Sequence, residues 1–421
     1  MDDAESLALM EEHGVGYSST GLVARMRANG NLWQEGDVKV KLAKAYGYCW
    51  GVERAVQMAY EARKQYPNSK LHVTNEIIHN PATVCHDQRL KEMEVNIIED
   101  VGKGKDFSGI KGEDVVILPA FGASWQEMKM LSDKGVQIVD TTCPWVAKVW
   151  SAVDNQARKQ HTSIIHGKYS HEETIATASF ATTYLIVRDI PETQYVVDYI
   201  LNGGDREEFL AKFSNAMSEG FDPDRDLLRI GLANQTTMLR DETLTIGKML
   251  EKTMMQKYGP AELKDHYMVL DTICDATQAG SSPLLAERQD AVTELVQKQS
   301  DPAERVDFML VVGGFNSSNT SHLQEIPEMA GVPSFWVNSA ACVDVEHNKI
   351  THKLAHGELV ETQPWLRDGP ITVGVTSGAS TPDRAVEEVL DKLFRIKDPS
   401  FSGIAQLSME AALTPPSRPE H

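Results

Sequence analysis

A cysteine that stands between a β-like run and a helix-like run is the feature that most constrains this chain. In the clearest copy, residues 136–140 form a short apolar run, and Thr141 and Thr142 lead to Cys143 and Pro144. Proline at the first helical position costs no backbone hydrogen bond, and the positive end of a helix lowers the pKa of a nearby thiol. This setting therefore favours the thiolate that metal ligation needs.

The same setting is predicted twice more. Cys49 follows a strand-like stretch at 38–48 and precedes a helix-like stretch at 51–56, while Cys274 follows 267–273. Positions 49 and 143 are 94 residues apart, and positions 143 and 274 are 131 apart. Each spacing suits one small α/β unit, so three units could each deliver one thiolate to a common centre. The alternative for each is a helix-start cysteine that only packs.

Length and composition agree with several intracellular α/β units. The 421 residues suggest about three domains. The chain has 61 acidic and 41 basic side chains, which gives a net charge of −20. That charge argues against a nucleic-acid partner. Five cysteines without a short disulfide framework fit a reducing interior. No apolar run approaches the roughly 18 residues of a membrane span.

Strand-like and helix-like stretches alternate from residue 37, which is typical of parallel α/β structure. A helix is predicted at 241–258, and the charged stretch 205–226 is predicted to lie at the surface. The expected organisation is an N-terminal arm at 1–36, α/β units at 37–142, 143–273 and 274–396, and a disordered tail at 397–421. The strongest strand candidates are 71–74, 115–118, 162–165, 228–232, 308–312 and 371–375.

Polar residues follow most of these strands, where ligands bind in open parallel sheets. Glycines with Ser, Thr and Asn at helix starts supply the donors that an anion such as a diphosphate requires. Each turn alone is more often an ordinary helix cap. His79 and His171, which follow two different strands, favour an anion site.

Only three cysteines stand in the strand–cysteine–helix setting, and this number distinguishes a structural zinc site from an iron–sulfur cluster. Structural zinc is closed by four ligands, whereas three thiolates on an iron–sulfur cluster leave one iron open. Cys85 and Cys342 lack the strand–cysteine–helix setting and are predicted not to ligate.

Eight short motifs carry a resemblance to a known family over residues 37–396. They resemble, in order, those of the 4-hydroxy-3-methylbut-2-enyl diphosphate reductases, the IspH/LytB family, and are most similar to its plastid and cyanobacterial branch. The motifs begin at Tyr46, Asn75, Asp140, His171, Asn234, Ile273, Asn316 and Ser377.

The resemblance implies three small parallel-sheet α/β units in a pseudo-threefold trefoil around one [4Fe-4S] cluster. Cys49, Cys143 and Cys274 would ligate the cluster and leave one iron open. The implied reaction is reductive dehydroxylation of (E)-4-hydroxy-3-methylbut-2-enyl diphosphate to isopentenyl and dimethylallyl diphosphates, the last step of the methylerythritol phosphate pathway. An external donor such as ferredoxin or flavodoxin would supply the electrons.

The resemblance also implies roles for individual residues. Glu173 and Thr236 would serve proton transfer, with Glu173 as the proton source and the neighbouring Glu172 without that role. The residues implied to bind the diphosphate substrate are His79, His171, Thr236, Ser317, Ser318, Asn319 and Ser380.

Two features depart from the family pattern. Many members have a histidine where this chain has Phe121, so Lys168 or backbone amides would take the place of that phosphate ligand. Residues 279–286 look like an insertion after Cys274. Two other functions stay open: a non-catalytic iron–sulfur electron carrier, and a zinc hydrolase using His171 and Glu173. The expected compartment is the plastid stroma in a eukaryote, although no transit peptide is visible, or the cytoplasm in a bacterium.

Overall fold

The computed structural model describes residues 4–12, 14–77, 94–98, 104–268, 283–355 and 357–406. The described residues fall into two compact units. One unit contains the residues up to 53 and from 287 onward, and the other contains those between positions 54 and 286.

The second unit contains two parallel sheets, of which the first has the strand order β4-β3-β5-β6. All four residues of β5 are buried, as expected for a strand covered on both faces. Helix α5 begins with a capping box in which Ser124 and Glu127 satisfy each other's backbone N–H groups. The elements are α3 (Trp50–Gln65), β3 (Leu71–Val73), β4 (Val95–Ile97), β5 (Val115–Leu118), α5 (Trp125–Asp133) and β6 (Gln137–Asp140).

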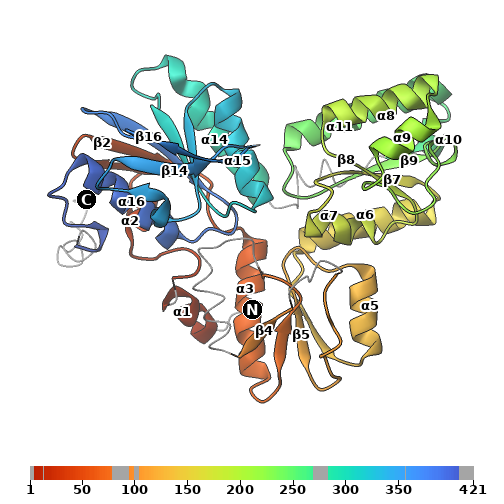
Figure 1. Cartoon of the computed structure of the whole chain (residues 1–421), viewed down its shortest axis with the longest axis horizontal. Helices are drawn as coiled ribbons and strands as arrows, with labels where there is room; N and C mark the ends of the chain where they lie inside the picture. Colours follow the sequence, from red (N-terminus) through yellow and green to blue (C-terminus); the bar gives the residue numbers. More distant parts are fainter. Residues whose placement is uncertain are drawn as a thin grey trace, which may run out of the picture. The chain divides into compact units, whose positions relative to one another are not determined.

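The second sheet of this unit has the order β10-β9-β7-β8 and is also parallel throughout. Helices α6 and α7 lie on one face, and the parallel pair α8 and α11 lies on the other (Figure 1). The elements are α6 (Pro144–Arg158), β7 (Thr162–His166), α7 (Glu172–Ala178), β8 (Tyr184–Val187), α8 (Ile190–Asn202), β9 (Ile230–Asn234), α11 (Arg240–Tyr258), α12 (Leu263–His266) and β10 (Tyr267–Met268).

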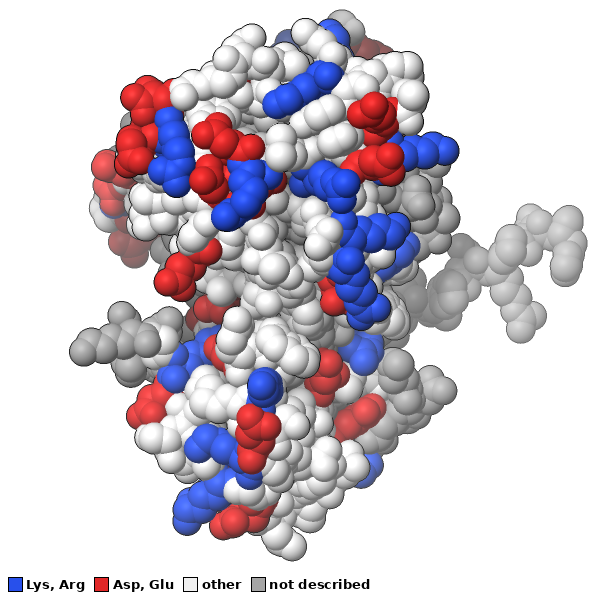
Figure 2. All heavy atoms as spheres, turned by 90° about the vertical axis from the view of Figure 1, so that its right-hand side faces the viewer, with Lys and Arg blue, Asp and Glu red and all other residues white. Residues whose placement is uncertain are grey.

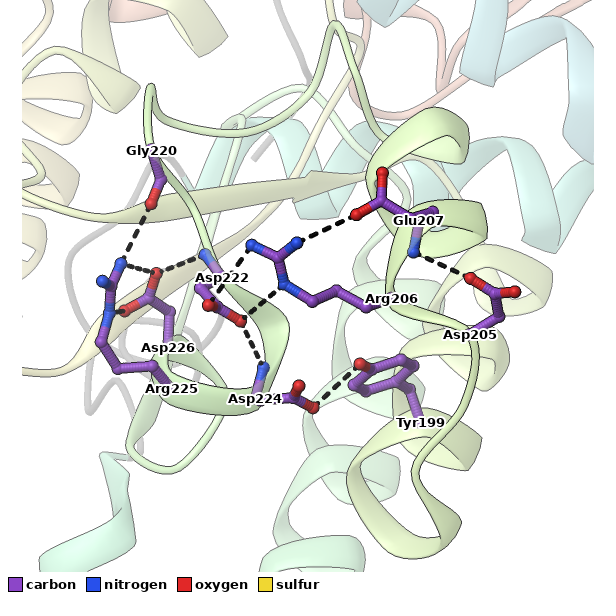
Figure 3. Close-up of polar contacts among 9 residues, drawn as sticks. All are labelled: Tyr199, Asp205, Arg206, Glu207, Gly220, Asp222, Asp224, Arg225 and Asp226. Atoms are coloured by element: carbon purple, nitrogen blue, oxygen red, sulfur yellow. Dashed lines mark hydrogen bonds and ion pairs between the residues drawn. The ribbon is translucent and has the colours of Figure 1, made fainter.

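The charged stretch 205–226 forms two short helices, α9 (Arg206–Lys212) and α10 (Pro223–Asp226). Asp205 and Asp222 cap these helices, and Arg206 lies 3.3 Å from Asp222, so the charges are paired locally (Figure 3). Phe209 and Phe213 are fully buried beneath them. The stretch is therefore a charged surface anchored by aromatic side chains.

The first unit is built on one eight-stranded sheet. Its central strands β2-β16-β11-β12 are parallel, and β1, β13, β14 and β15 extend the sheet in antiparallel pairs. The strands are β1 (Leu32–Glu35), β2 (Val38–Leu42), β11 (Phe308–Val312), β12 (Ser334–Val337), β13 (Val343–Asp344), β14 (Lys349–Lys353), β15 (Leu359–Thr362) and β16 (Ile371–Ser377).

Alternating residues of β11 show that both faces of this sheet are covered. Leu310 belongs to a core with α2 and α16, whereas Met309 and Val311 belong to a second core with α14 and α15. The helices of this unit are α1 (Ala4–Glu12), α2 (Leu22–Ala28), α14 (Pro283–Gln297), α15 (Ser318–Met329) and α16 (Asp383–Lys397).

The predicted fold class, three parallel-sheet α/β units, is confirmed, although the third sheet is mixed. The unit boundaries stay predictions. Strand β2 lies within the predicted first unit but pairs with β16. Within the predicted arm, Leu22, Val23 and Met26 place one face of a short helix in the core. Within the predicted tail, Phe401 and Ile404 are buried in that core, so the chain stays packed beyond residue 397.

The surface carries charges of both signs. On the face drawn in Figure 2, Lys and Arg side chains lie among Asp and Glu side chains. Among the helices that the structure describes, none is both long enough and apolar enough to cross a bilayer.

Candidate functional site

Cys49 is buried at the start of helix α3. Its Sγ accepts a 3.4 Å hydrogen bond from the backbone N–H of Val52 in the first helical turn. Burial raises the pKa of the Cys49 thiol, while the positive charge of Arg288 and the N–H of Val52 lower it. Amide donors of this kind stabilise a sulfur that carries negative charge.

The strand predicted to run to position 48 is shorter than expected, because β2 ends at Leu42. A loop at 43–49 follows, in which Gly47 has a left-handed φ of 68°. The N–H of Gly47 donates to Ser377 O and that of Cys49 donates to Ala379 O, so the loop follows the end of β16. The helix predicted after Cys49 is confirmed, but the cysteine stands at the end of a loop.

Two side chains bind the carbonyl groups just before Cys49. The guanidinium of Arg288 donates to the carbonyl oxygens of Tyr46, Gly47 and Tyr48, with Nη2 at 3.3, 2.6 and 2.6 Å. The Tyr17 hydroxyl lies 2.7 Å from Tyr48 O. Neither side chain was singled out from the sequence, because both lie far from Cys49 along the chain.

Cys143 is the N-cap of helix α6, with Pro144 in the first turn, as its sequence setting predicts. Its N–H donates to Ala120 O, which ties the loop to the end of β5. Nη1 of Arg54 lies 3.2 Å from Thr142 O and 3.4 Å from Thr141 O. An arginine therefore binds the carbonyl groups before this cysteine as well.

The structure brings His171, Glu173 and Thr236 together at the carboxyl ends of the neighbouring strands β7 and β9. His171 caps helix α7, and its Nδ1 accepts from the N–H of Glu173 at 3.2 Å. The side chain of Glu173 is buried, and its Oε1 accepts from the N–H of Thr236 at 2.5 Å. Because Nδ1 is an acceptor, a neutral His171 carries its proton on Nε2.

Gln235, whose role is not predicted from the sequence, organises these two turns. It is fully buried, and its Oε1 accepts 3.0 Å hydrogen bonds from the N–H of Lys168 and from the hydroxyl of Thr174. Its position between Asn234 and Thr236 in a motif was the available signal. The glutamine thus fixes the turn after β7 to the turn after β9.

Glu172 has different neighbours from Glu173. Its Oε1 accepts from Asn75 Nδ2 at 2.9 Å, and its Oε2 lies 3.4 Å from the ammonium of Lys105. Lys105 is itself buried and also pairs with Glu127. The two adjacent carboxylates therefore serve separate networks.

Ser317, Ser318, Asn319 and Ser380 are buried where β11 and β16 end in the first unit. Ser317 caps helix α15, and Asn319 Oδ1 accepts from the N–H of Ala379 at 2.8 Å. Gly378 permits this close approach, since a Cβ there would collide with the Thr320 hydroxyl. Helix α15 therefore begins directly against the end of β16.

Several polar groups at this place lack a hydrogen-bond partner within the described parts of the chain. Among them are the hydroxyls of Ser318 and Ser377 and the amide nitrogen Nδ2 of Asn319. Buried polar groups are nearly always hydrogen-bonded, so unmatched ones indicate a missing partner. Two hydroxyls, an amide and the start of a helix are donors that suit an anion. Ser377 belongs to a recognised motif but was not predicted as a site residue.

Several predicted residues cannot be placed. His79, Cys85 and Cys274, with residues 279–282 of the 279–286 stretch, lie outside the described residues. Within the described ranges no three His, Cys, Asp or Glu side chains form a group that could hold a metal ion. Cys342 Sγ lies 3.1 Å from Asn338 Oδ1.

Comparisons with known proteins give the family. A family model described as LytB protein matches residues 40–394. The chain belongs to the LytB family. It is 70% identical to the 4-hydroxy-3-methylbut-2-enyl diphosphate reductase, chloroplastic, of Botryococcus braunii, over 96% of this chain and 79% of that protein. It is 57% identical to the Synechocystis protein named 4-hydroxy-3-methylbut-2-enyl diphosphate reductase, over 90% of this chain and 95% of the relative.

A solved structure supports the fold of this LytB protein. The structure of the E-1-hydroxy-2-methyl-but-2-enyl-4-diphosphate reductase from Plasmodium falciparum matches with a TM-score of 0.60. The match covers 89% of this chain and 98% of that chain, at 22% sequence identity. The likeness shows that the two chains share a fold.

Proposed function

We propose that this LytB protein catalyses the reductive dehydroxylation of (E)-4-hydroxy-3-methylbut-2-enyl diphosphate to isopentenyl and dimethylallyl diphosphates. Two electrons and two protons enter, the allylic carbon–oxygen bond breaks, and the hydroxyl group leaves as water. The names of relatives 57–70% identical to the chain favour this reaction over a zinc hydrolase or an electron carrier.

The observation that carries the proposal is the set of unmatched donors on Ser318, Asn319 and Ser377. The substrate's diphosphate would accept from Ser318 and Asn319, aided by Ser317, Ser380, His79, His171 and Thr236. Hydrogen bonds to a charged group stabilise by roughly 1.5–3 kcal/mol each. Binding the diphosphate in this way would fix the position of the allylic hydroxyl.

The cofactor in this proposal is one [4Fe-4S] cluster held by Cys49, Cys143 and Cys274. Such a cluster supplies electrons and, with three thiolate ligands, leaves one iron open to the substrate's oxygen. The described residues fit this group, since Cys49 and Cys143 both precede helix starts and Cys49 Sγ accepts from an amide N–H. Electrons would come from a ferredoxin or flavodoxin.

Glu173 is the proposed proton source for the departing hydroxyl group. Without a proton the carbon–oxygen cleavage would release hydroxide, and general acid catalysis typically contributes about 10²–10⁴-fold. The N–H of Thr236 orients the Glu173 carboxylate. The proposed compartment is the plastid stroma in a eukaryote or the cytoplasm in a bacterium.

Anaerobic purification of the full chain tests the proposal. We expect iron and acid-labile sulfide in equal amounts, about four of each per chain for one such cluster, and conversion of the substrate to both products under a strong reductant. Iron and sulfide without conversion would indicate an electron carrier. Zinc without sulfide would indicate the hydrolase.

A further inference from the structure

The three carbonyl oxygens before Cys49 meet a single cation. Gly47, in the left-handed region with φ 68°, lets the carbonyl groups of Tyr46, Gly47 and Tyr48 converge. Nη2 of Arg288 lies within hydrogen-bonding distance of all three oxygens, and its Nε donates to Gly47 O at 3.1 Å. One guanidinium thus binds the whole turn before Cys49, in addition to the Tyr17 hydroxyl and the backbone hydrogen bonds to the end of β16.

This guanidinium is among the most buried large side chains of the described protein. Arg288 lies in the second turn of helix α14 and is 1% exposed. A buried cation is costly unless negative charge or oriented dipoles compensate it. The three carbonyl dipoles provide part of that compensation, and a thiolate at Cys49 would provide negative charge.

Cys143 has a similar arrangement on a different sheet. Nη1 of Arg54 lies 3.2 Å from Thr142 O and 3.4 Å from Thr141 O, directly before that cysteine. Both described members of the proposed cysteine set therefore follow carbonyl groups that accept from an arginine. The recurrence on two sheets argues against an accidental contact.

We propose that Arg288 is a positioning residue for the iron–sulfur cluster: it holds the 46–48 loop so that Cys49 presents its sulfur to iron, and its buried charge favours the reduced cluster. This inference rests on the proposed function. Arg54 has the same positioning role for the loop of Cys143.

Arginine and lysine separate the two parts of this role. A guanidinium presents several N–H groups in a rigid plane, whereas an ammonium is a compact point charge. Arg288→Lys keeps the charge but cannot reach the three oxygens in the same way, and Arg288→Gln removes the charge. Lys41→Gln is the matched control, because Lys41 is a buried cation of the same unit that donates to Ala303 O and Glu304 O.

The experiment uses the full chain carrying its cluster and measures two properties. The first is the rate of iron release to a chelator, and the second is the midpoint potential of the cluster in a redox titration followed by electron paramagnetic resonance. For Arg288→Gln we expect iron release faster by roughly tenfold or more, because hydrogen bonds to a charged group are lost, and a more negative potential. Arg288→Lys should release iron faster than wild type but keep the potential near the wild-type value.

The result expected for the control variant differs from the results that would overturn the inference. Lys41→Gln should leave both properties unchanged even if the melting temperature falls. Wild-type iron release and potential in Arg288→Gln would overturn the inference, as would equal changes in Lys41→Gln. If Arg288→Gln does not fold, Arg288→Lys tests the inference instead. An unchanged rate of iron release in Arg288→Lys would then overturn it. A wild-type protein without iron and sulfide would instead refute the proposed function.

Discussion

The Glu173 carboxylate and the Thr236 backbone are joined by a 2.5 Å hydrogen bond from N–H to Oε1, which links the turns after β7 and β9. The glutamate is 3% exposed, so its position is determined by this bond and by the packing around helix α7. Because the contact uses a backbone donor, substitution of the threonine side chain leaves the donor in place. The roles of the two residues can therefore be tested separately.

Glu173→Gln should keep the cluster and the affinity for substrate but lose most turnover. The amide preserves an oxygen that can accept from the Thr236 N–H, while the proton that a carboxyl group could donate is lost. We expect the rate to fall by about 10²–10⁴-fold, the usual contribution of a general acid. Single-turnover kinetics under saturating reductant measure this, and a near wild-type rate would exclude Glu173 as the required acid.

Glu172→Gln is the matched control. The amide can still accept from Asn75, but it loses the charge that faces the buried Lys105. We expect nearly unchanged turnover together with a lower melting temperature. A fall in turnover as large as that of Glu173→Gln would show that turnover depends on the negative charge in this region and not on the proton of Glu173.

Thr236→Val tests whether the threonine hydroxyl relays the proton. The substitution preserves shape and the N–H bonded to Glu173 but removes a group that can both donate and accept. If the hydroxyl carries the proton, turnover should fall by roughly ten- to a hundredfold, within the range of proton-transfer effects, while iron content stays constant. Wild-type turnover would restrict Thr236 to orienting Glu173 through its backbone.

Asn319→Asp tests the anion site of the first unit. The aspartate keeps an oxygen that can accept from the Ala379 N–H, but it replaces the unmatched amide Nδ2 with a negative charge. Substrate affinity should fall by about a hundredfold or more, since a charge-assisted bond becomes a repulsion. Calorimetric titration measures the change. Ser321→Ala, on the same helix but bonded to Ala355 O, should bind normally, and unchanged affinity in Asn319→Asp would place the diphosphate elsewhere.

Arg27→Met should loosen the attachment of the N-terminal segment. Oδ2 of Asp383 accepts from Arg27 and from the N–H of Ser18, and the aspartate side chain is almost completely buried. Leaving that carboxylate without its cation should cost roughly 1–3 kcal/mol of unfolding free energy at neutral pH. Thermal unfolding measures the loss, and Arg158→Met, which removes an exposed pair with Asp154, should cost little.

The loss in Arg27→Met should depend on pH. Burial raises the pKa of Asp383, while the Ser18 N–H and Arg27 lower it, so removal of Arg27 raises that pKa further. A raised folded-state pKa means that the folded chain binds a proton more readily than the unfolded chain, so stability increases as pH falls. The deficit of the variant should therefore shrink between pH 7 and roughly pH 5. A deficit that grows on acidification would contradict this account.

The sequence predicts the local parts of the molecule well and its distant pairings poorly. The strand–helix setting of Cys143 is visible because β6, the cysteine and Pro144 are adjacent in sequence. The pairing of β2 with β16 joins residues more than 300 positions apart, and no local pattern indicates it. Leu22 and Phe401 enter the same core from segments predicted to be an arm and a tail.

The same limit applies to the candidate site. His171 and Glu173 stand in one short motif, so their proximity can be predicted. The contact of Glu173 with Thr236 follows from the adjacent parallel strands β7 and β9. Arg288 is different, because its partners lie 240 or more positions away and its own neighbours in sequence do not indicate burial. Only the folded chain shows that a cation lies beside the loop of Cys49.

The last prediction concerns the cysteines themselves. Replacement of Cys49, Cys143 or Cys274 by serine should each abolish activity and remove most of the iron, because a neutral hydroxyl is a far weaker ligand for iron than a thiolate. Cys85→Ser and Cys342→Ser are the controls and should keep both. The Cys342 sulfur lies 3.1 Å from Asn338 Oδ1 in a short 3₁₀ turn, a contact that a serine hydroxyl can also make. Iron and sulfide analysis of the five variants, each purified in the same way without oxygen, tests the assignment. Full iron content in any of the first three variants would remove that cysteine from the ligand set. Loss of iron from either control would add a ligand that the sequence pattern does not predict.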